Sequence, residues 1–309
     1  PEWIHITASD RNVVWKVVRD TLTDNVIGMG TIIMDPKNQR GYVRGFMVDP
    51  DYQSYGVGGW LALNAFQEFA IKYRDVIKII WTENRTAHAK SQKISEAAGM
   101  RPVGLFPNKD IFLTKRESDV LFALYAMNAL KMRRPEPALI PAVMPIFRVV
   151  GHQFRLGDAV PTQVPRTHAD GYAVQGFISV DKYNYRYCTY RANGRELKFM
   201  INPRTRVAEK TWFSPDIDPV TLKTLLRSAR ISLNPKIYYM ECYVSAFQPA
   251  IQQVFIDLGY VPTGYIPGWD LVDGKREDRI IMTWVREIPP LVSMQLTRRA
   301  MKIAKLFLS

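Results

Sequence analysis

The stretch that decides the fold is Val48-Asp-Pro-Asp-Tyr-Gln-Ser-Tyr-Gly-Val-Gly-Gly-Trp-Leu61, which joins the end of an apolar run to the start of a helical pattern. Its three glycines, Gly56, Gly58 and Gly59, allow the backbone to turn tightly and to expose its N–H groups. The first N–H groups of a helix have no partner inside the helix and carry partial positive charge. The stretch therefore predicts a phosphate or pyrophosphate site at a helix start, with a purely structural turn as the alternative.

The sequence on either side of this turn alternates between strand-like and helix-like runs. Before it, short polar turns separate β-rich runs at residues 12–20, 26–34 and 41–48. Connections this short predict an antiparallel meander. After it we expect a helix, a buried strand and a second helix at residues 56–73, 76–81 and 86–98. The predicted fold class is mixed α/β.

The glycine pattern differs from two common phosphate motifs. No Gly-Lys-Ser/Thr follows, as Walker A requires, and the dinucleotide fingerprint needs its glycines directly after a parallel strand. Val-x-Pro-x-x-Gln-x-x-Gly-x-Gly instead resembles the acyl-CoA-binding signature of the GNAT superfamily of N-acetyltransferases. The run from Asn84 to Met100 resembles the second conserved helix of that family, and residues 104–114 would supply the closing strands. The resemblance covers about residues 12 to 115.

The resemblance implies that acetyl-CoA, or another acyl-CoA, binds as a co-substrate between two central strands. It places the pantetheine arm along Phe46, Met47 and Val48, with Asn84 contacting the arm from the next strand. The pyrophosphate would lie on the loop and the first helical turn, at Gln53, Ser54, Tyr55, Gly56, Val57, Gly58, Gly59 and Trp60.

The implied reaction is direct attack of an amine on the thioester, which requires a proton acceptor and stabilisation of the oxyanion. Many relatives use a tyrosine of the late helix as the acid, but the matching residue here is Ser95, and in the second half it is Phe255. Glu83 is our candidate general base, with a solvated carboxylate at a strand end as the alternative. His88 is a further candidate because histidine titrates near neutrality, with a packed or capping histidine as the alternative.

The second half resembles the same family but lacks the first signature. We expect strand-like runs, helices and a last hairpin at residues 176–190, 197–213, 219–231, 236–244, 249–258, 264–271 and 279–285. Leu258-Gly259-Tyr260 resembles the exit of the late helix. The sequence between Thr211 and Arg230 contains no glycine, so its backbone cannot easily present N–H groups to a pyrophosphate. We predict a degenerate lobe that keeps the fold but binds no CoA by this route.

These patterns predict two GNAT-like lobes joined by a helix and a proline-rich linker. The helix is expected at residues 118–132, and the four prolines at residues 135–145 predict a stiff linker. The last segment predicts a basic amphipathic helix that packs on its own domain or a partner subunit, or lies on an anionic membrane surface. The predicted divisions are residues 1–115, 116–150, 151–288 and 289–309.

Composition limits the class of protein. The chain has 309 residues, a formal charge of +13 and 47% hydrophobic residues, which excludes a wholly disordered chain. No apolar run is long enough to span a membrane. Cys188 and Cys242 predict buried thiols in a reducing compartment, so we expect a cytoplasmic protein. The histidines have no metal-ligand spacing, so no metal is predicted.

The acceptor and the partners stay open at this stage. The acceptor is an amine of a small molecule or of a protein. The chain begins at a proline, and only residues 1–11 precede the meander, where relatives have elements that wall the acceptor site. An upstream domain, a partner subunit, the helix expected at 118–132 or the second lobe could supply that wall. A non-catalytic scaffold that binds protein or nucleic acid, and other acyl-CoA chemistry, are the alternative functions.

Overall fold

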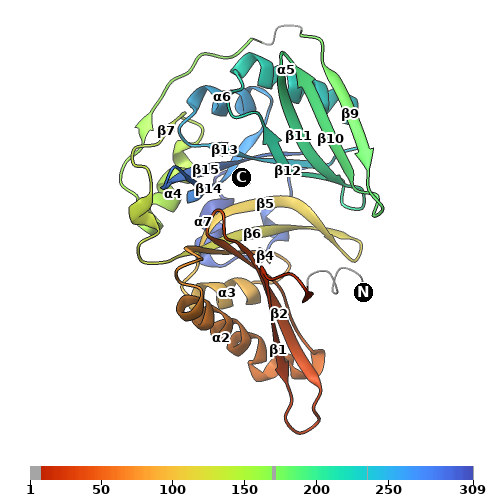
Figure 1. The fold of residues 1–309 in the computed structure, drawn as a ribbon, viewed down its shortest axis with the longest axis vertical. Helices are drawn as coiled ribbons and strands as arrows, with labels where there is room; N and C mark the ends of the chain where they lie inside the picture. Colours follow the sequence, from red (N-terminus) through yellow and green to blue (C-terminus); the bar gives the residue numbers. More distant parts are fainter. Residues whose placement is uncertain (1–7, 169–171, 235, 309) are drawn as a thin grey trace.

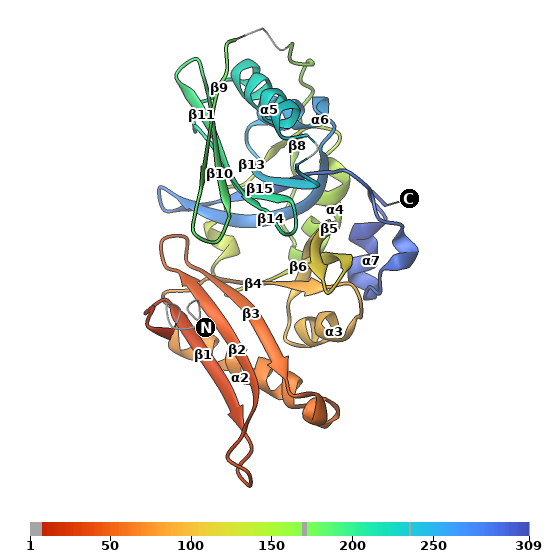
Figure 2. The same ribbon diagram turned by 90° about the vertical axis from the view of Figure 1, so that its right-hand side faces the viewer.

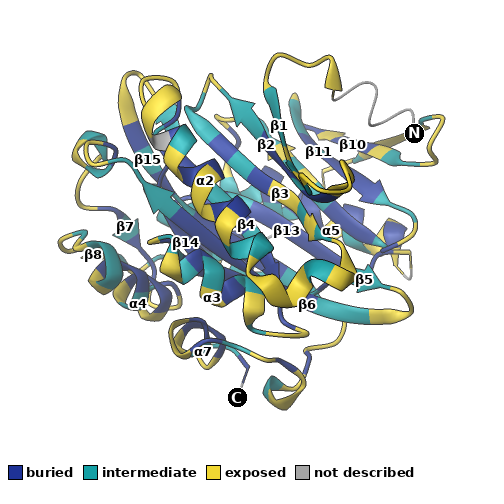
Figure 3. Ribbon diagram, turned by 90° about the horizontal axis from the view of Figure 1, so that it is seen from below, coloured by how far each residue is buried: buried dark blue, intermediate teal, exposed yellow. Residues whose placement is uncertain are grey.

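The computed structural model describes residues 8–168, 172–234 and 236–308. A continuous mixed sheet of thirteen strands runs through both halves, in the order β1-β2-β3-β4-β6-β5-β14-β15-β13-β12-β11-β10-β9 (Figure 1). Its central strands carry most of the buried residues, whereas exposed residues gather on the outer sides of the helices and in the loops (Figure 3). The predicted mixed α/β class is confirmed.

The first lobe follows the expected order of elements, with one extra strand at its end. Its elements are β1 (Val13–Arg19), β2 (Val26–Asp35), β3 (Arg40–Val48), η1 (Pro50–Tyr55), α2 (Val57–Lys72), β4 (Ile79–Arg85), α3 (Lys90–Ala97), β5 (Arg101–Phe112) and β6 (Lys115–Tyr125). The first three strands form the predicted antiparallel meander. β3 and β4 are parallel, because α2 crosses from one to the other.

The second lobe repeats this order. Its elements are β10 (Arg186–Ala192), β11 (Arg195–Asn202), β12 (Val207–Phe213), α5 (Pro219–Leu233), β13 (Tyr239–Ser245), α6 (Pro249–Asp257), β14 (Val261–Val272) and β15 (Lys275–Val285). β9 (Gln175–Val180) adds an edge strand beside β10. The remaining elements are η2 (Leu130–Met132), β7 (Ala138–Leu139), α4 (Met144–Phe154), β8 (Val160–Pro161), η3 (Leu291–Ser293) and α7 (Arg298–Ala304).

The lobes meet where β5 pairs with β14, through Gly104 and Gly264. A Cβ built on Gly104 would lie 3.1 Å from the Cα of Gly264, and a Cβ built on Gly264 would lie 3.0 Å from the Cα of Gly104. The two backbones approach each other too closely for side chains at this point. Glycine at both positions therefore allows the two half-sheets to join.

The hairpins on the two sides of this junction have related sequences. Residues 101–125 correspond to residues 261–285 at a constant offset of 160, which aligns Pro102 with Pro262 and Lys115-Arg-Glu117 with Lys275-Arg-Glu277. The register shifts at matching places in the two hairpins, between Pro102 and Gly104 in one and between Pro262 and Gly264 in the other. The shared bulges indicate that both hairpins follow one structural plan.

The prediction of a helix at residues 118–132 is wrong. Residues 115–125 form β6, which lies between β4 and β5 in the sheet, and only the short η2 follows. Residues 118–123 are buried. A continuous apolar run of this kind fits a buried strand as well as a buried helix, so periodicity alone does not separate the two.

The linker and the final helix also differ from expectation. Residues 135–145 contain β7 and the start of α4, so this segment is packed structure. The basic tail forms η3 and the short α7, in which Ala300, Ile303 and Ala304 are buried. The apolar stripe of the tail therefore packs against this chain, as the first of the two expectations had it.

Each lobe is followed by an extension that packs on the other lobe. The first-lobe extension (residues 126–154) ends in α4, which contacts β14, and the second-lobe extension (residues 286–308) contains α7, which contacts β5 (Figure 2). Gln252 of α6 fixes the first-lobe extension: its Nε2 donates to the carbonyl of Ala138 (2.9 Å), and its Oε1 accepts from the N–H of Ile140 (3.2 Å). Gln92 of α3 makes the matching contacts with Gln295 and Thr297. The two extensions therefore cross between the lobes.

Candidate active site

A gap opens in the first lobe between β3 and β4. The two strands pair from Arg40 and Ile79 to Val43 and Thr82, and both then continue without pairing to each other. The divergence coincides with a register shift between β2 and β3, where Gly45 has a φ of 65°. A bulge of this kind bends the strand away from its neighbour. The free edge of β3 at residues 44–48 therefore faces the gap.

The glycine-rich turn lies directly after this edge. Gly56 has a φ of 76° and is the N-cap of α2, with no side-chain cap hydrogen bond. Trp60 donates to the carbonyl of Gly56 (3.0 Å), so the N–H groups of Val57, Gly58 and Gly59 come before the helical hydrogen bonds begin. A Cβ built on Gly56 or on Gly59 would meet nothing within 4 Å. The start of α2 is thus open, uncapped and suited to an anion.

The other residues predicted for the cofactor lie around this open end. Gln53, Ser54, Tyr55 and Trp60 are exposed, but the Nε2 of Gln53 donates to the carbonyl of Val48 (3.2 Å). Met47 is exposed. The ring of Phe46 packs on β2, where a Cβ on Gly30 would lie 2.6 Å from it. The structure therefore brings the predicted loop residues together at the mouth of the gap.

The second lobe has a different helix start. Asp218 is the N-cap of α5, and its side chain accepts a hydrogen bond from the N–H of Thr221 (2.9 Å). Although burial raises the pKa of Asp218, the hydrogen bonds from Thr221 outweigh it and lower that pKa overall. A carboxylate of this chain thus occupies the helix end where an anion would bind.

The gap of the second lobe is bridged as well. β12 and β13 pair only from Val207 and Tyr239 to Ala208 and Met240. Beyond that point the hydroxyl of Thr211 donates to the carbonyl of Glu241 (2.6 Å), from one strand to the other. The backbone edge that a pantetheine arm would use is therefore partly engaged in this lobe.

The catalytic candidates lie on different sides of β4. Asn84 donates through Nδ2 to the Oγ of Ser95 (2.8 Å), and both side chains are buried beneath α3. Glu83 is the neighbour of Asn84, so it points to the opposite face of the sheet. His88 is exposed in the loop before α3. The structure does not bring Glu83, Ser95 and His88 together.

Glu83 belongs to a buried charged group that the sequence did not indicate. Lys109 of β5 lies with its Nζ 3.4 Å from Glu83 and 3.3 Å from Glu241 of β13, so one lysine bridges carboxylates of both lobes. The hydroxyl of Tyr239 donates to Glu241 (2.8 Å). Burial raises the pKa of Glu83 and of Glu241, and Lys109 opposes the rise in both. One sequence signal could have found Lys109 and Glu241. At an offset of 160 residues, Lys109 matches Trp269 and Glu241 matches Trp81, so a charged residue in one lobe stands where the other lobe has a tryptophan.

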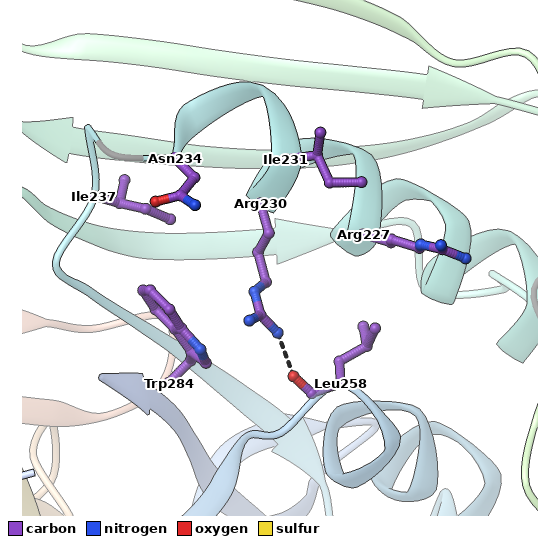
Figure 4. A pocket seen from close by; sticks show the side chains of 7 residues that line it. All are labelled: Arg227, Arg230, Ile231, Asn234, Ile237, Leu258 and Trp284. Atoms are coloured by element: carbon purple, nitrogen blue, oxygen red, sulfur yellow. Dashed lines mark hydrogen bonds between the residues drawn. The ribbon is translucent and has the colours of Figure 1, made fainter. Parts of the chain in front are cut away.

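A pocket of about 290 Å³ lies elsewhere in the second lobe, between α5, the end of α6 and β15 (Figure 4). Arg230 points into it from α5, donates to the carbonyl of Leu258 and lies 4.8 Å from the ring of Trp284. These contacts already engage its guanidinium. The pocket belongs to the lobe whose helix start is capped, so it is separate from the candidate site.

Two absences among the described residues bear on the site. Within residues 8–168, 172–234 and 236–308, the His, Cys, Asp and Glu side chains form no group that could hold a metal ion. In the same residues, no helix is long and apolar enough to cross a membrane. Cys188 and Cys242 are buried and free, as expected.

The chain was compared with known proteins. No curated protein sequence matches it. Among solved structures it is similar to the ribosomal-protein-S18-alanine N-acetyltransferase of Escherichia coli, with 19% identity, coverage of 40% of this chain and 76% of that chain, and a TM-score of 0.36. It is also similar to the spermidine N-acetyltransferase of Vibrio cholerae in complex with CoA and spermine, with 17% identity, coverage of 40% and 72%, and a TM-score of 0.36.

The family comparison identifies the first lobe. Residues 2–99, which include the meander, the glycine-rich turn, α2, β4 and α3, match the model of the acetyltransferase (GNAT) family. The match contains the glycine-rich segment and follows the second segment from Asn84 as far as Gly99. The first third of this chain is therefore a domain of the GNAT acetyltransferase family.

Proposed function

We propose that this protein is an acyl-CoA-dependent N-acyltransferase that transfers acetyl from acetyl-CoA to an amine in its first lobe. The observation that carries the proposal is the uncapped start of α2 beside the gap between β3 and β4. The backbone N–H groups of the first helical turn have no partner inside the helix, and such groups suit the pyrophosphate of CoA. The family match over residues 2–99 supports the same cofactor.

Each part of the site has a role in this proposal. The N–H groups of Val57, Gly58 and Gly59 bind the pyrophosphate, and the free edge of β3 at residues 46–48 holds the pantetheine arm. Gln53, Ser54, Tyr55 and Trp60 line the mouth. The side chain of Asn84 is engaged by Ser95, so a contact of Asn84 with the arm would use its backbone. The thioester then lies in the gap, where β3 and β4 no longer pair.

The chemical step is an acyl transfer. The amine nitrogen attacks the thioester carbonyl, the C–N bond forms and the C–S bond breaks. The proton of the amine passes to Glu83, and the CoA thiolate takes a proton from water. Holding the two reactants in line supplies much of the rate enhancement. Because burial raises the pKa of Glu83, this carboxylate is a stronger base than an exposed one.

The catalytic roles predicted for Ser95 and His88 have weaker support than that of Glu83. Ser95 is a buried residue of α3, which covers the face of β4 opposite to Glu83, and His88 lies in an exposed loop. A role for Ser95 as acid, or for His88 in proton transfer, stays a prediction. The second lobe is degenerate in this proposal, since Asp218 caps its helix and Thr211 bridges its gap.

The experiment that tests the proposal has two parts. Titration calorimetry with CoA is carried out on the parent protein and on a Gly59→Glu variant, which places a carboxylate at the pyrophosphate site. Mass spectrometry of products from several acyl-CoAs and amines then identifies the acyl group that is transferred. A parent protein that binds no CoA would refute the proposal.

A further inference from the structure

The face of the first lobe that carries Glu83 is unusually acidic. Arg85 of β4 lies opposite Asp119 of β6, and Asp110 of β5 lies opposite Glu117 of β6. Residues that lie opposite each other share a face, as do residues two apart on one strand. Glu83, Asp110 and Asp119 therefore project from the same face, and Lys109 shows that this face meets the second lobe.

The second lobe adds two more carboxylates to this face. Glu241 lies 3.3 Å from the Nζ of Lys109. Glu209 of β12 lies two residues after Val207, which pairs with Tyr239, so it projects from the same face as Glu241. We name Glu83, Asp110, Asp119, Glu209 and Glu241 the interlobe acidic cluster.

The charges of this cluster are poorly balanced. The cluster holds five carboxylates and one buried lysine, Lys109, in a chain whose formal charge is +13. Lys210 is exposed next to Glu209, and Arg44 of β3 lies beside Tyr42. Two arginines that border the cluster, Arg85 and Arg116, bind groups outside it. Arg85 forms a bidentate pair with Glu117, and Arg116 donates to the carbonyls of Asn108 and Thr205. Asp119 and Glu241 are buried with Lys109 as their one buried lysine, and burying like charges is costly, so protons or a further cation would stabilise the cluster.

The two lobes differ in charge at one pair of matching positions. In the second lobe Asp270 pairs with Arg279, with an Nε to Oδ2 distance of 2.6 Å. The matching residues of the first lobe, 160 positions earlier, are Asp110 and Asp119. An ion pair in one lobe thus corresponds to two like charges in the other. Burial and the charges of Asp110 and Glu83 raise the pKa of Asp119.

Asp119 also has an unused acceptor. Its side chain is 2% exposed, and its Oδ2 is buried without a hydrogen-bond partner among the described residues. Buried polar atoms in folded proteins are nearly always paired, so an orphan acceptor in an acidic site indicates a missing donor. Glu83 and Asp110 keep part of their surface in solvent, which gives access to the cluster.

We propose that the interlobe acidic cluster binds an alkylammonium group of a small polyvalent amine, which is the acceptor of the acyl transfer. This inference rests on the proposed function for its catalytic meaning. One ammonium group lies between Asp110 and Asp119, in the place that the guanidinium of Arg279 takes in the other lobe. A second amino group, in its neutral form, reaches Glu83 and attacks the thioester. The degenerate lobe contributes Glu241 and Glu209 to the acceptor site.

The test uses the full chain and measures amine binding separately from catalysis. Calorimetry without CoA compares 1,4-diaminobutane with butylamine and with 1,4-butanediol. The variants are Asp119→Asn, which removes one charge, and Asp119→Arg, which restores the ion pair of the other lobe. Asp75→Asn is the matched control, because Asp75 is an exposed aspartate outside the cluster. CoA titration and melting temperature show whether each variant is folded, and Asp119→Asn decides if Asp119→Arg does not fold.

We expect the parent and Asp75→Asn to bind 1,4-diaminobutane at least ~10-fold more tightly than butylamine, and not to bind the diol. Both Asp119 variants should lose at least ~10-fold in diamine affinity while binding CoA as the parent does. Equal diamine binding by the parent and both variants would overturn the inference. Displacement of the diamine by MgCl2 at equal concentration would also overturn it, in favour of a divalent-cation site.

The two proposals fail in different ways. If CoA binds and acyl transfer occurs but the diamine does not bind, the acceptor site is wrong and the proposed function stands. If the diamine binds as expected but the parent binds no CoA, the proposed function fails and the cationic-amine site stands.

Discussion

Gln92 of α3 and Gln252 of α6 make the same three hydrogen bonds, 160 residues apart. Each donates to the carbonyl at the end of the preceding strand, Arg85 in one lobe and Ser245 in the other (3.1 Å in both). Each also donates to and accepts from the extension that follows the opposite lobe. Both side chains are fully buried. Two equivalent glutamines therefore hold the crossed extensions against the opposite lobes.

The first prediction concerns these two glutamines. Gln252→Ala and Gln92→Ala each leave buried carbonyl and N–H groups without partners, which costs about 1–3 kcal/mol per group. We expect each variant to lower the urea midpoint of the full chain clearly. Gln67→Ala is the control, because Gln67 is exposed in the middle of α2 and alanine is the better helix former there. A midpoint for Gln252→Ala equal to that of Gln67→Ala would contradict the role of the two glutamines.

The second prediction concerns the junction of the half-sheets. Gly104→Ala places a Cβ 3.0 Å from the Cδ1 of Ile281 and 3.1 Å from the Cα of Gly264. Because the second contact is with backbone, relief requires the strands to separate, so we expect a loss of about 1–3 kcal/mol in stability. Thermal unfolding measures the change. Gly59→Ala has open space for its Cβ and should unfold at or above the temperature of the parent.

The third prediction concerns the start of α2. Gly59→Glu has open space around its Cβ, and a carboxylate in the first turn favours the helix, so the variant should fold. The same charge repels a pyrophosphate, and we expect CoA affinity to fall at least ~10-fold. Gly59→Ala keeps the backbone N–H groups and should bind CoA as the parent does. Indistinguishable CoA affinities for the glutamate and alanine variants would place the cofactor elsewhere.

The fourth prediction concerns Glu83. Proton abstraction requires its ionised form, and burial raises its pKa, so kcat/KM should rise with pH through a pKa above that of an ordinary glutamate and then level off. Glu83→Gln should lower kcat roughly 10²- to 10⁴-fold and remove that limb of the pH profile. CoA affinity should stay unchanged, since Glu83 is not part of the pyrophosphate site. A Glu83→Gln variant with the pH profile of the parent would exclude Glu83 as the base.

Much of the first lobe follows from local sequence. β1, β2, β3 and α2 lie within a few residues of their predicted bounds, because alternating and helical periodicities are clear where an element has one face in solvent. The glycine spacing at Gly56–Gly59 was enough to predict an open helix start, and the lack of glycine between Thr211 and Arg230 predicted its loss in the second lobe. Backbone conformation at a turn depends on few residues, so local sequence carries this information.

β6 is a strand that the local sequence pattern did not predict. Its apolar run is buried against strands on both sides, and such a run has no periodicity to mark it as a strand. One signal was present: Lys115-Arg-Glu117 matches Lys275-Arg-Glu277, which opens a strand of the predicted last hairpin. Comparing the two halves position by position would have identified β6.

By itself, the sequence determined the order of the early elements, and it predicted the open helix start at α2 and the absence of a glycine-rich one in the second lobe. Only the tertiary structure decided that the extensions cross between the lobes and that Lys109, Glu83 and Glu241 meet. The reason is the range of the interactions involved. A turn or a helix start depends on neighbouring residues, whereas a charged group shared by strands more than 100 residues apart exists only once the sheet brings them together.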